Sequence, residues 1–368
     1  MKIQIIDGST RFSGGRRMLF LHANELVRRG HDVTLWVEQE RPVDWMRLEF
    51  PVQFLDRKPL GALPGADLFL FQRWRFARPV CRARRGIPVH FCQGFEGIDA
   101  ENRLAKVMEH PWRHLVRIWK LKRRLRRLDR AYHMPTAKIV VHQPLRDLLM
   151  ERYQQAAYLV PYGLPTEVFY RHEAPVPPSA NVLVVGPASI GWKRIGDALE
   201  TVRLLKQGRP DVRLIRVAPE PMTAAERAAG VTDEYHTMLK PPQMAEQYRR
   251  AAVLAVTSDP TEGFGLPALE AMACGTPTVL TDIPSFRHFA YPTDYATFVP
   301  VGRPDVLAQT LARLLTDTTW RARLTERGLQ VAARYTLQRS YQTMSDTLAE
   351  ILNHGAVRHD RAPQRRRA

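Results

Sequence analysis

Two glutamates, Glu262 and Glu270, lie at the two ends of a glycine-bearing segment, with seven residues between them. A predicted strand precedes the segment, and a helix is predicted from about Pro267, because proline suits the first helical turn. Gly263 and Gly265 let a backbone approach a ligand, and a helix N-terminus offers free N–H groups to an anion. Carboxylates accept paired hydroxyl hydrogen bonds, so the segment suits a ribose or a sugar ring. It also fits an ordinary strand–loop–helix connection with solvated glutamates.

A second segment, Val185–Arg194, also follows a predicted strand and precedes a helix. A lysine at Lys193 can neutralise the negative charge that develops on a leaving diphosphate. The alternative is an exposed lysine at the start of a helix. A third segment, Ser13–Arg17, follows the first predicted strand and contains Gly14 and Gly15; taken alone, it is an ordinary turn.

Each of these segments follows a predicted strand, so the strands must form sheets if the segments are to lie close together. The strand–helix–strand pattern of Lys2–Ile6, Met18–Arg29 and Asp32–Val37 predicts a parallel α/β sheet. Further strands of a first series are predicted at 67–71, 89–93, 138–142 and 158–161. A second series is predicted at 181–186, 212–217, 253–257, 278–281 and 297–300.

A proline-rich stretch separates the two series, which predicts two Rossmann-like domains. The predicted boundaries are 1–172 for the first domain and 173–335 for the second. A C-terminal helix, 336–354, is expected to pack back on the first domain, and a basic tail, 355–368, is expected to be disordered.

The stretch EGFGLPALEAMACGTPTV, which starts at Glu262, resembles the Glu-x7-Glu signature of retaining glycosyltransferases of family 4. The resemblance implies the α/β GT-B fold, in which two Rossmann-like domains face each other across a cleft. It places Glu262 beside the donor sugar and Glu270 on the ribose hydroxyls. It assigns donor contacts to the intervening backbone, namely Gly263, Phe264, Gly265 and Leu266.

The resemblance also makes Lys193 the phosphate-binding lysine and Gly14 and Gly15 the loop that approaches the donor phosphate. The chain departs from the family at Pro187, where many members have arginine, and at Arg194, where they have glycine. Either Arg194 or Arg16 is expected to supply the missing charge.

Acceptor contacts are expected from the weakly matching region of the first domain. Gln93 and Glu96 follow a predicted strand where many family members have a cleft histidine. Each could bind hydroxyl groups of the acceptor or donor. Each also fits a loop with solvated polar groups.

The segment Pro111–Tyr132 predicts a basic amphipathic helix with an apolar stripe at Ile118, Leu121, Leu125, Leu128 and Tyr132. Such a helix suits an anionic membrane surface. The residues expected there are Trp112, Arg117, Trp119, Lys120, Arg123, Arg124 and Arg127. The alternatives are a helix that packs its stripe on the core and a nucleic-acid contact, which no recognition module supports.

The composition, with 45% hydrophobic and 25% charged residues, is that of an ordinary soluble globular protein. The net charge is +18, which suits phosphorylated ligands, an anionic membrane or nucleic acid. Three scattered cysteines fit a reducing compartment, and no apolar run approaches the ~20 residues of a membrane span. The protein is therefore expected in the cytoplasm, with peripheral contact to the inner face of the cell membrane.

The sequence thus predicts a hexosyltransferase that uses a nucleotide sugar and a glycan or lipid-linked acceptor, with retention and without a metal or other cofactor. A nucleotide-sugar epimerase or a phosphorylase has a similar architecture, but the glutamate motif argues against both. The alternative outside enzymology is a degenerate protein of the same fold that binds a nucleotide sugar or a partner.

Overall fold

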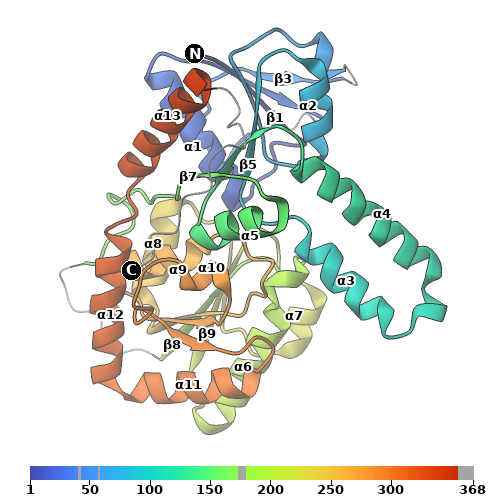
Figure 1. Ribbon diagram of the computed structural model, residues 1–368. Helices are drawn as coiled ribbons and strands as arrows, with labels where there is room; N and C mark the ends of the chain where they lie inside the picture. Colours follow the sequence, from blue (N-terminus) through green and yellow to red (C-terminus); the bar gives the residue numbers. More distant parts are fainter. Residues whose placement is uncertain (40–42, 57–58, 173–179, 355–368) are drawn as a thin grey trace, which may run out of the picture. The chain divides into compact units, whose positions relative to one another are not determined.

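The computed structural model describes residues 1–39, 43–56, 59–172 and 180–354. Contacts divide the chain into two units, which Figure 1 allows the reader to follow by colour. Unit 1 comprises Met1–Pro161 with Tyr341–Ala368, and unit 2 comprises Tyr162–Ser340. The sequence predicted the division at residues 172 and 173. The predicted tail, 355–368, and the start of the predicted second domain, 173–179, lie outside the described residues.

Unit 1 contains a parallel sheet of seven strands in the order β3-β2-β1-β4-β5-β6-β7. The strands are β1 Lys2–Asp7, β2 Asp32–Val37, β3 Val52–Phe54, β4 Leu68–Phe71, β5 Ile87–Cys92, β6 Ala137–Val140 and β7 Tyr158–Leu159. The inner strands β4 and β6 are buried along their whole length, as expected for a parallel sheet covered on both faces.

The helices of unit 1 connect these strands in sequence. They are α1 Gly14–Arg28, η1 Leu60–Ala62, η2 Trp74–Phe76, α2 Ala77–Ala83, α3 Ile98–Met108, η3 Pro111–Arg113, α4 Leu115–Tyr132 and α5 Gln143–Tyr153. The last helix, α13 Leu337–His354, begins in unit 2 and continues into unit 1. Its Met344, Leu348 and Ile351 are buried, and the Arg29 guanidinium donates to Gln342 Oε1 at 3.0 Å.

Unit 2 contains a parallel sheet of six strands in the order β10-β9-β8-β11-β12-β13. The strands are β8 Asn181–Val185, β9 Arg213–Ala218, β10 Glu234–Thr237, β11 Val253–Val256, β12 Thr278–Thr281 and β13 Thr297–Val299. The helices are η4 Gly191–Lys193, α6 Ile195–Gly208, α7 Ala224–Ala229, α8 Pro241–Arg250, α9 Leu266–Ala273, α10 Pro284–Arg287, α11 Pro304–Thr316 and α12 Thr318–Ala332.

An apolar core lies under the helices of unit 2. It joins side chains from β8 and β9 to α6 and α11, among them Val182, Leu214, Val202 and Leu311. Val182 and Leu214 are fully buried, so this core holds the strands of the sheet in place. The loops at the strand ends lie outside it.

The predicted α/β class with two parallel sheets is confirmed. Every predicted strand is present within about two residues. The sequence did not predict β3 and β10. β3 is an outer strand of the sheet of unit 1, and β10 is an outer strand of the sheet of unit 2. Both are short, and β10 carries the polar sequence EYHT, so neither shows the apolar run of a buried strand.

Each sheet reverses its strand order at one point. In unit 1 the reversal lies between β1 and β4, and in unit 2 between β8 and β11. Ligands of open α/β sheets bind at such a point, outside the carboxyl ends of the strands. The loops after β8 and β11 hold the two strongest sequence motifs, so the fold places both motifs at the switch point of unit 2.

Candidate functional site

Lys193 and Glu262 form an ion pair at this switch point. Lys193 Nζ lies 2.6 Å from Glu262 Oε2. The side chains are 16% and 10% exposed, respectively, so the pair is shielded from bulk water but still reachable. The lysine comes from the loop after β8 and the glutamate from the loop after β11.

The surroundings keep Glu262 ionised. Burial raises the pKa of this carboxyl, but the charge of Lys193 and hydrogen bonds from Lys193, Ser258 and the Gly263 N–H outweigh that effect. The pKa of Glu262 therefore lies below its ordinary value. Ser258 Oγ donates to Glu262 Oε2 at 2.8 Å.

Further hydrogen bonds fasten the two loops together. Thr257 Oγ1 donates to the backbone oxygens of Lys193, at 2.9 Å, and of Arg194, at 3.1 Å. The Asp259 N–H donates to the Trp192 carbonyl at 2.8 Å. Lys193 and Glu262 are thus held by backbone contacts as well as by their own pairing.

Gly265 allows the tight turn into α9. Its φ is +86°, and a Cβ there would lie 2.7 and 2.8 Å from two ring atoms of Phe286. Neither the backbone conformation nor the space suits a larger residue. The preceding Phe264 is buried between the rings of Tyr162 and His288, with centroids at 4.9 and 4.8 Å.

Glu270 lies on α9 and is 4% exposed. The Tyr248 hydroxyl, from α8, donates to Glu270 Oε2 at 2.8 Å. Leu266 is buried at the start of the same helix. The side chain of Glu270 is therefore held in one position by a neighbouring helix.

A buried ion pair supports the loop that carries Lys193. Arg216 of β9 donates to the carbonyls of Val184, at 2.7 Å, and Gly186, at 2.9 Å. Its guanidinium also lies 2.8 Å from Glu226 Oε1. Arg216 and Glu226 are nearly inaccessible to solvent, so they position backbone and do not reach a ligand.

The two arginines expected to replace the family arginine are both paired with carboxylates. Arg194 Nε lies 2.6 Å from Asp197 Oδ2. Arg16 Nε lies 2.7 Å from Asp7 Oδ2, and Arg16 is buried. The compensating role of either residue stays a prediction.

The first glycine loop lies at the start of α1 in unit 1. Gly15 packs directly against Gln93: the Gln93 amide donates to the Gly15 carbonyl at 2.9 Å, and a Cβ on Gly15 would overlap Gln93 Oε1. Gly14 is exposed beside it. The structure thus links Gln93, predicted on the acceptor side, to the predicted donor loop.

Glu96 lies near the carboxyl end of β5. Its Oε1 accepts the Trp74 N–H at 2.7 Å and lies 4.0 Å from His90 Nε2. Burial raises the pKa of Glu96 to about 7, against the opposing effects of the Trp74 N–H and of nearby arginines.

The predicted basic helix is observed as η3 and α4. All seven residues predicted at a membrane surface, Trp112, Arg117, Trp119, Lys120, Arg123, Arg124 and Arg127, are exposed. The predicted apolar stripe is used for packing, since Ile118, Leu128 and Tyr132 are buried.

Three important neighbours were not predicted from the sequence, namely Ser258, Tyr248 and Arg216. Ser258 adjoins the glutamate motif, so its position was a usable signal. Tyr248 lies 22 residues before Glu270, and no local pattern indicates that pairing.

Within the described ranges, no helix is long and apolar enough to cross a bilayer. In the same residues, no group of three or more His, Cys, Asp or Glu side chains is arranged to hold a metal ion.

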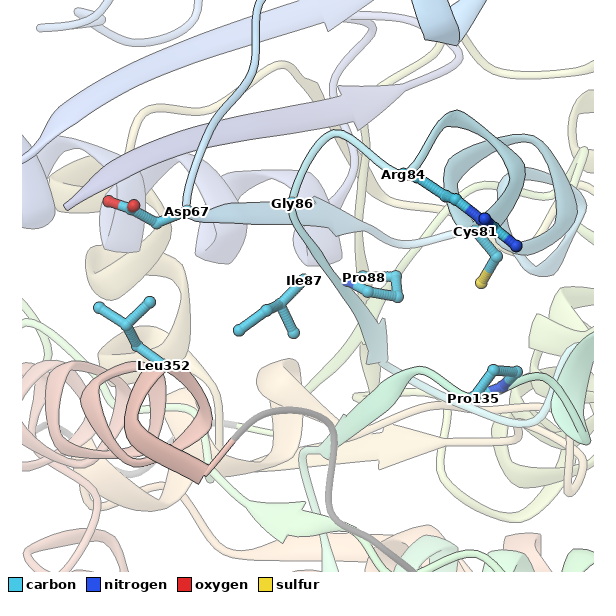
Figure 2. Close-up of a pocket in the computed structure, with 8 residues that line it drawn as sticks. All are labelled: Asp67, Cys81, Arg84, Gly86, Ile87, Pro88, Pro135 and Leu352. Carbon is cyan, nitrogen blue, oxygen red and sulfur yellow. The ribbon is translucent and has the colours of Figure 1, made fainter.

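A hollow of about 610 Å³ lies in unit 1 near the amino ends of β4, β5 and β6, away from the carboxyl ends of these strands (Figure 2). It is lined by Asp67, Cys81, Arg84, Gly86, Ile87, Pro88, Pro135 and Leu352. None of the predicted site residues lines it.

Residues 179–317 match the family model described as "Glycosyl transferases group 1". This range contains the Lys193–Glu262 pair and Glu270. The D-inositol 3-phosphate glycosyltransferase of Salinispora arenicola is 35% identical over 127 residues, which are 33% of this chain and 28% of that protein. The phosphatidyl-myo-inositol mannosyltransferase of Mycobacterium leprae is 27% identical over 162 residues, 42% of this chain and 41% of that protein. The chain therefore spans less than half the length of these relatives.

Solved structures match nearly the whole chain. Sucrose-phosphate synthase from Thermosynechococcus elongatus has a TM-score of 0.75 and 18% identity, covering 96% of this chain and 100% of that one. The Anabaena protein HepE in complex with UDP-glucose has a TM-score of 0.72 and 15% identity, covering 95% and 100%. These likenesses confirm the predicted GT-B fold.

Proposed function

We propose that this chain is a glycosyltransferase that moves a hexose-type sugar from a nucleotide-diphosphate sugar to a hydroxyl of a glycan or lipid-linked saccharide. The observation that carries the proposal is the Lys193–Glu262 pair beside the start of α9, at the switch point of unit 2. The family match over 179–317 supports the transfer of a sugar.

Two of the similar proteins support the substrate classes. HepE was solved with UDP-glucose, which supports a nucleotide sugar as the donor. The Mycobacterium leprae relative is named for phosphatidyl-myo-inositol, which supports a lipid-linked acceptor. The three free cysteines fit a cytoplasmic setting.

The donor side of the proposal uses four features of unit 2. Lys193 and the N–H groups at the start of α9 stabilise the diphosphate. The backbone from Gly263 to Leu266 contacts the sugar and the diphosphate. Glu270 accepts hydrogen bonds from the ribose hydroxyls, with Tyr248 keeping its carboxylate in position.

The reaction breaks the bond between the anomeric carbon and the diphosphate oxygen and forms a bond from the acceptor oxygen on the same face. The acceptor proton passes to the leaving phosphate, so configuration is retained without a protein nucleophile. Glu262 lies beside the sugar and stabilises positive charge at its ring. Lys193 moves from Glu262 to the leaving group as negative charge develops there. Neither a metal nor another cofactor takes part in this scheme.

The acceptor side of the proposal lies in unit 1. Gln93 and Glu96 bind acceptor hydroxyls, and the amides of Gly14 and Gly15 bind a donor phosphate. With a pKa of about 7, Glu96 can be protonated near neutrality, so it can donate as well as accept a hydrogen bond.

The test is calorimetric binding of UDP-, GDP-, dTDP- and ADP-sugars to the wild-type chain, to Lys193→Met and to Glu270→Gln. Tight binding of one donor is expected, with each variant weaker by about tenfold or more, because a hydrogen bond to a charged group is worth about 1.5–3 kcal/mol. Lys206→Met is the matched control, since this lysine pairs with Asp233 elsewhere in unit 2. Loss of affinity in the control as well would point to misfolding.

Transfer itself is tested with the donor so identified and an acceptor screen, and the anomeric configuration of the product is read by NMR. Donor binding without transfer or hydrolysis would favour the degenerate binding protein. An inverted product would overturn the retaining scheme while leaving the donor site intact.

A further inference from the structure

The hairpin formed by α3 and α4 exposes large apolar side chains at its end. Figure 1 shows the two helices extending side by side from the rest of unit 1, and their contacts agree. Trp112 is 86% exposed, Val116 68%, Leu115 61%, Trp119 54% and Met108 45%. These five residues, here named the hairpin tip, lie within twelve positions of the sequence. Such a concentration is unusual on a surface that contacts only water.

The apolar stripe inferred from the sequence does not explain the tip. Ile118, Leu128 and Tyr132 point into the protein and are buried. Leu115 and Trp119, one turn apart, lie on the other side of α4, together with Val116. The helix therefore has two apolar regions, and only one of them is covered by this chain within the described residues.

Basic residues continue the exposed face beyond the tip. Arg123, Arg126 and Arg130 follow Leu115 and Trp119 at spacings of three or four, which places them on the same side of the helix. The Arg123 guanidinium stacks on the Trp119 ring at 5.1 Å.

Within the described residues, few carboxylates lie near this charge. The segment Pro111–Tyr132 contains nine Lys and Arg residues against one acidic residue, Asp129. Asp129 is already engaged by the Tyr153 hydroxyl and by Arg152. No basic side chain of α4 lies within ion-pair distance of a carboxylate in the described part of the chain.

The order of these groups distinguishes a lipid surface from nucleic acid. Tryptophan and aliphatic side chains gain by entering the boundary between headgroups and acyl chains, and arginines behind them reach anionic headgroups. A phosphate backbone would attract the arginines but offers nothing to Leu115 and Val116.

We propose that the hairpin tip docks this protein on an anionic lipid surface, with Trp112, Leu115 and Val116 entering the interface. The arginines on the same face of α4, Arg123, Arg126 and Arg130, bind the headgroups. This docking is separate from the proposed transfer reaction, because it uses none of the donor or acceptor residues.

The test is flotation of the full chain with vesicles of phosphatidylcholine alone and with vesicles of equal parts phosphatidylcholine and phosphatidylglycerol. Binding is expected only to the anionic vesicles. A tip variant, Trp112→Ser with Leu115→Ser and Val116→Ser, is expected to bind at least tenfold more weakly. The tryptophan emission of the wild-type chain, which has seven tryptophans, is expected to shift to the blue on binding, and that of the tip variant to shift less.

A charge variant, Arg123→Gln with Arg126→Gln and Arg130→Gln, should bind about a hundredfold more weakly at low salt, at about fivefold for each basic residue. The matched control removes the same charge from α2 and α5 of unit 1, with Arg78→Gln, Arg82→Gln and Arg146→Gln, all exposed positions. It should retain most of the binding.

Unchanged flotation of the tip variant would overturn the proposal, as would an equal loss in the charge variant and its control. Binding to a DNA duplex that the tip variant retains, with no flotation of the wild-type chain, would assign the basic face to nucleic acid instead. Calorimetric unfolding of each variant without vesicles shows whether unit 1, which carries all of these substitutions, is folded. This control does not use donor binding, so the docking test stays independent of the transferase test.

Discussion

At the scale of single residues, the candidate site contains a lysine and a glutamate that already form an ion pair with each other. Lys193 is the cation proposed for the diphosphate, yet in this structure its ammonium contacts Glu262. An incoming diphosphate must therefore compete with a carboxylate that is fixed by Ser258 and by backbone. In the proposed reaction, this competition would weaken the hold on the leaving diphosphate and so favour its release.

Glu262→Gln tests this competition. The amide cannot neutralise Lys193, so affinity for the nucleoside diphosphate product is expected to rise about fivefold while transfer activity falls. Isothermal calorimetry gives the affinity and a coupled assay gives the rate. Weaker binding of the diphosphate would show that Glu262 helps to hold it and does not compete with it.

A pH effect is expected from Glu96. Its pKa is raised from 4.5 to about 7 in the folded protein, so the folded state holds the proton more tightly than the unfolded state. The unfolding free energy contributed by this group is greatest below 4.5 and falls as pH rises to about 7. Glu96→Gln should therefore raise the melting temperature more at pH 8 than at pH 4.5. An equal shift at both pH values would contradict this linkage.

At the scale of elements, the site depends on the conformation of the loops that connect strands to helices. The turn from β11 into α9 requires Gly265 with φ +86° and close contact to Phe286. The loop after β8 depends on Arg216, which donates to the carbonyl of Val184 in β8 and to that of Gly186 at the start of the loop. Neither residue needs to touch a substrate for its loss to displace the groups that do.

Gly265→Ala is expected to destabilise unit 2 by about 2–4 kcal/mol, from left-handed backbone strain and an overpacked contact. Gly196→Ala is the matched control, because a Cβ there meets nothing within 4 Å. It should be neutral or stabilising by up to about 1 kcal/mol. Thermal unfolding followed by calorimetry measures both, and similar losses in the two variants would refute the steric account.

Arg216→Met should cost about 3–5 kcal/mol of stability, because it leaves the buried Glu226 carboxylate without its cation. On the same strand, Arg213 is exposed and pairs with Glu234 at 3.4 Å. Arg213→Met should cost less than about 1 kcal/mol. Adding Glu226→Gln to Arg216→Met should recover part of the loss, which urea unfolding would reveal; no recovery would exclude charge burial as the cause.

Most of the strands could be predicted because buried parallel strands are short apolar runs. The motif loops could be predicted because glycines and charged residues follow those runs. The edge strand β10 could not, since half-exposed polar residues carry no periodic signal. The contacts of Glu270 with Tyr248 and of Gly15 with Gln93 join distant segments, so only the folded chain reveals them. The roles assigned to these site residues remain predictions.

At the scale of the whole molecule, the two units do not follow one another simply along the chain. Unit 1 takes its first part from Met1–Pro161 and its last helix from beyond unit 2. Met344, Leu348 and Ile351 of α13 are fully or almost fully buried. The stability of unit 1 therefore depends on residues encoded after all of unit 2.

Leu348→Ala is expected to cost about 2–5 kcal/mol, the range for removing a buried leucine side chain. Leu352, one turn further along α13, is 37% exposed, and Leu352→Ala should cost about 1 kcal/mol or less. The loss should appear in the calorimetric transition of unit 1, while the transition of unit 2 is unchanged. Equal effects of the two substitutions would show that α13 is not anchored by its buried side.

The late position of α13 also has a consequence during synthesis. When Pro161 leaves the ribosome, the sheet of unit 1 still lacks the helix that carries Met344, Leu348 and Ile351. Unit 2 is continuous and has all of its residues once Ser340 has emerged. Domains generally fold as they emerge, but here the domain that starts first is completed last. Newly made chains therefore pass through a period in which unit 1 exposes an unfinished apolar surface, the stage at which a chaperone would bind.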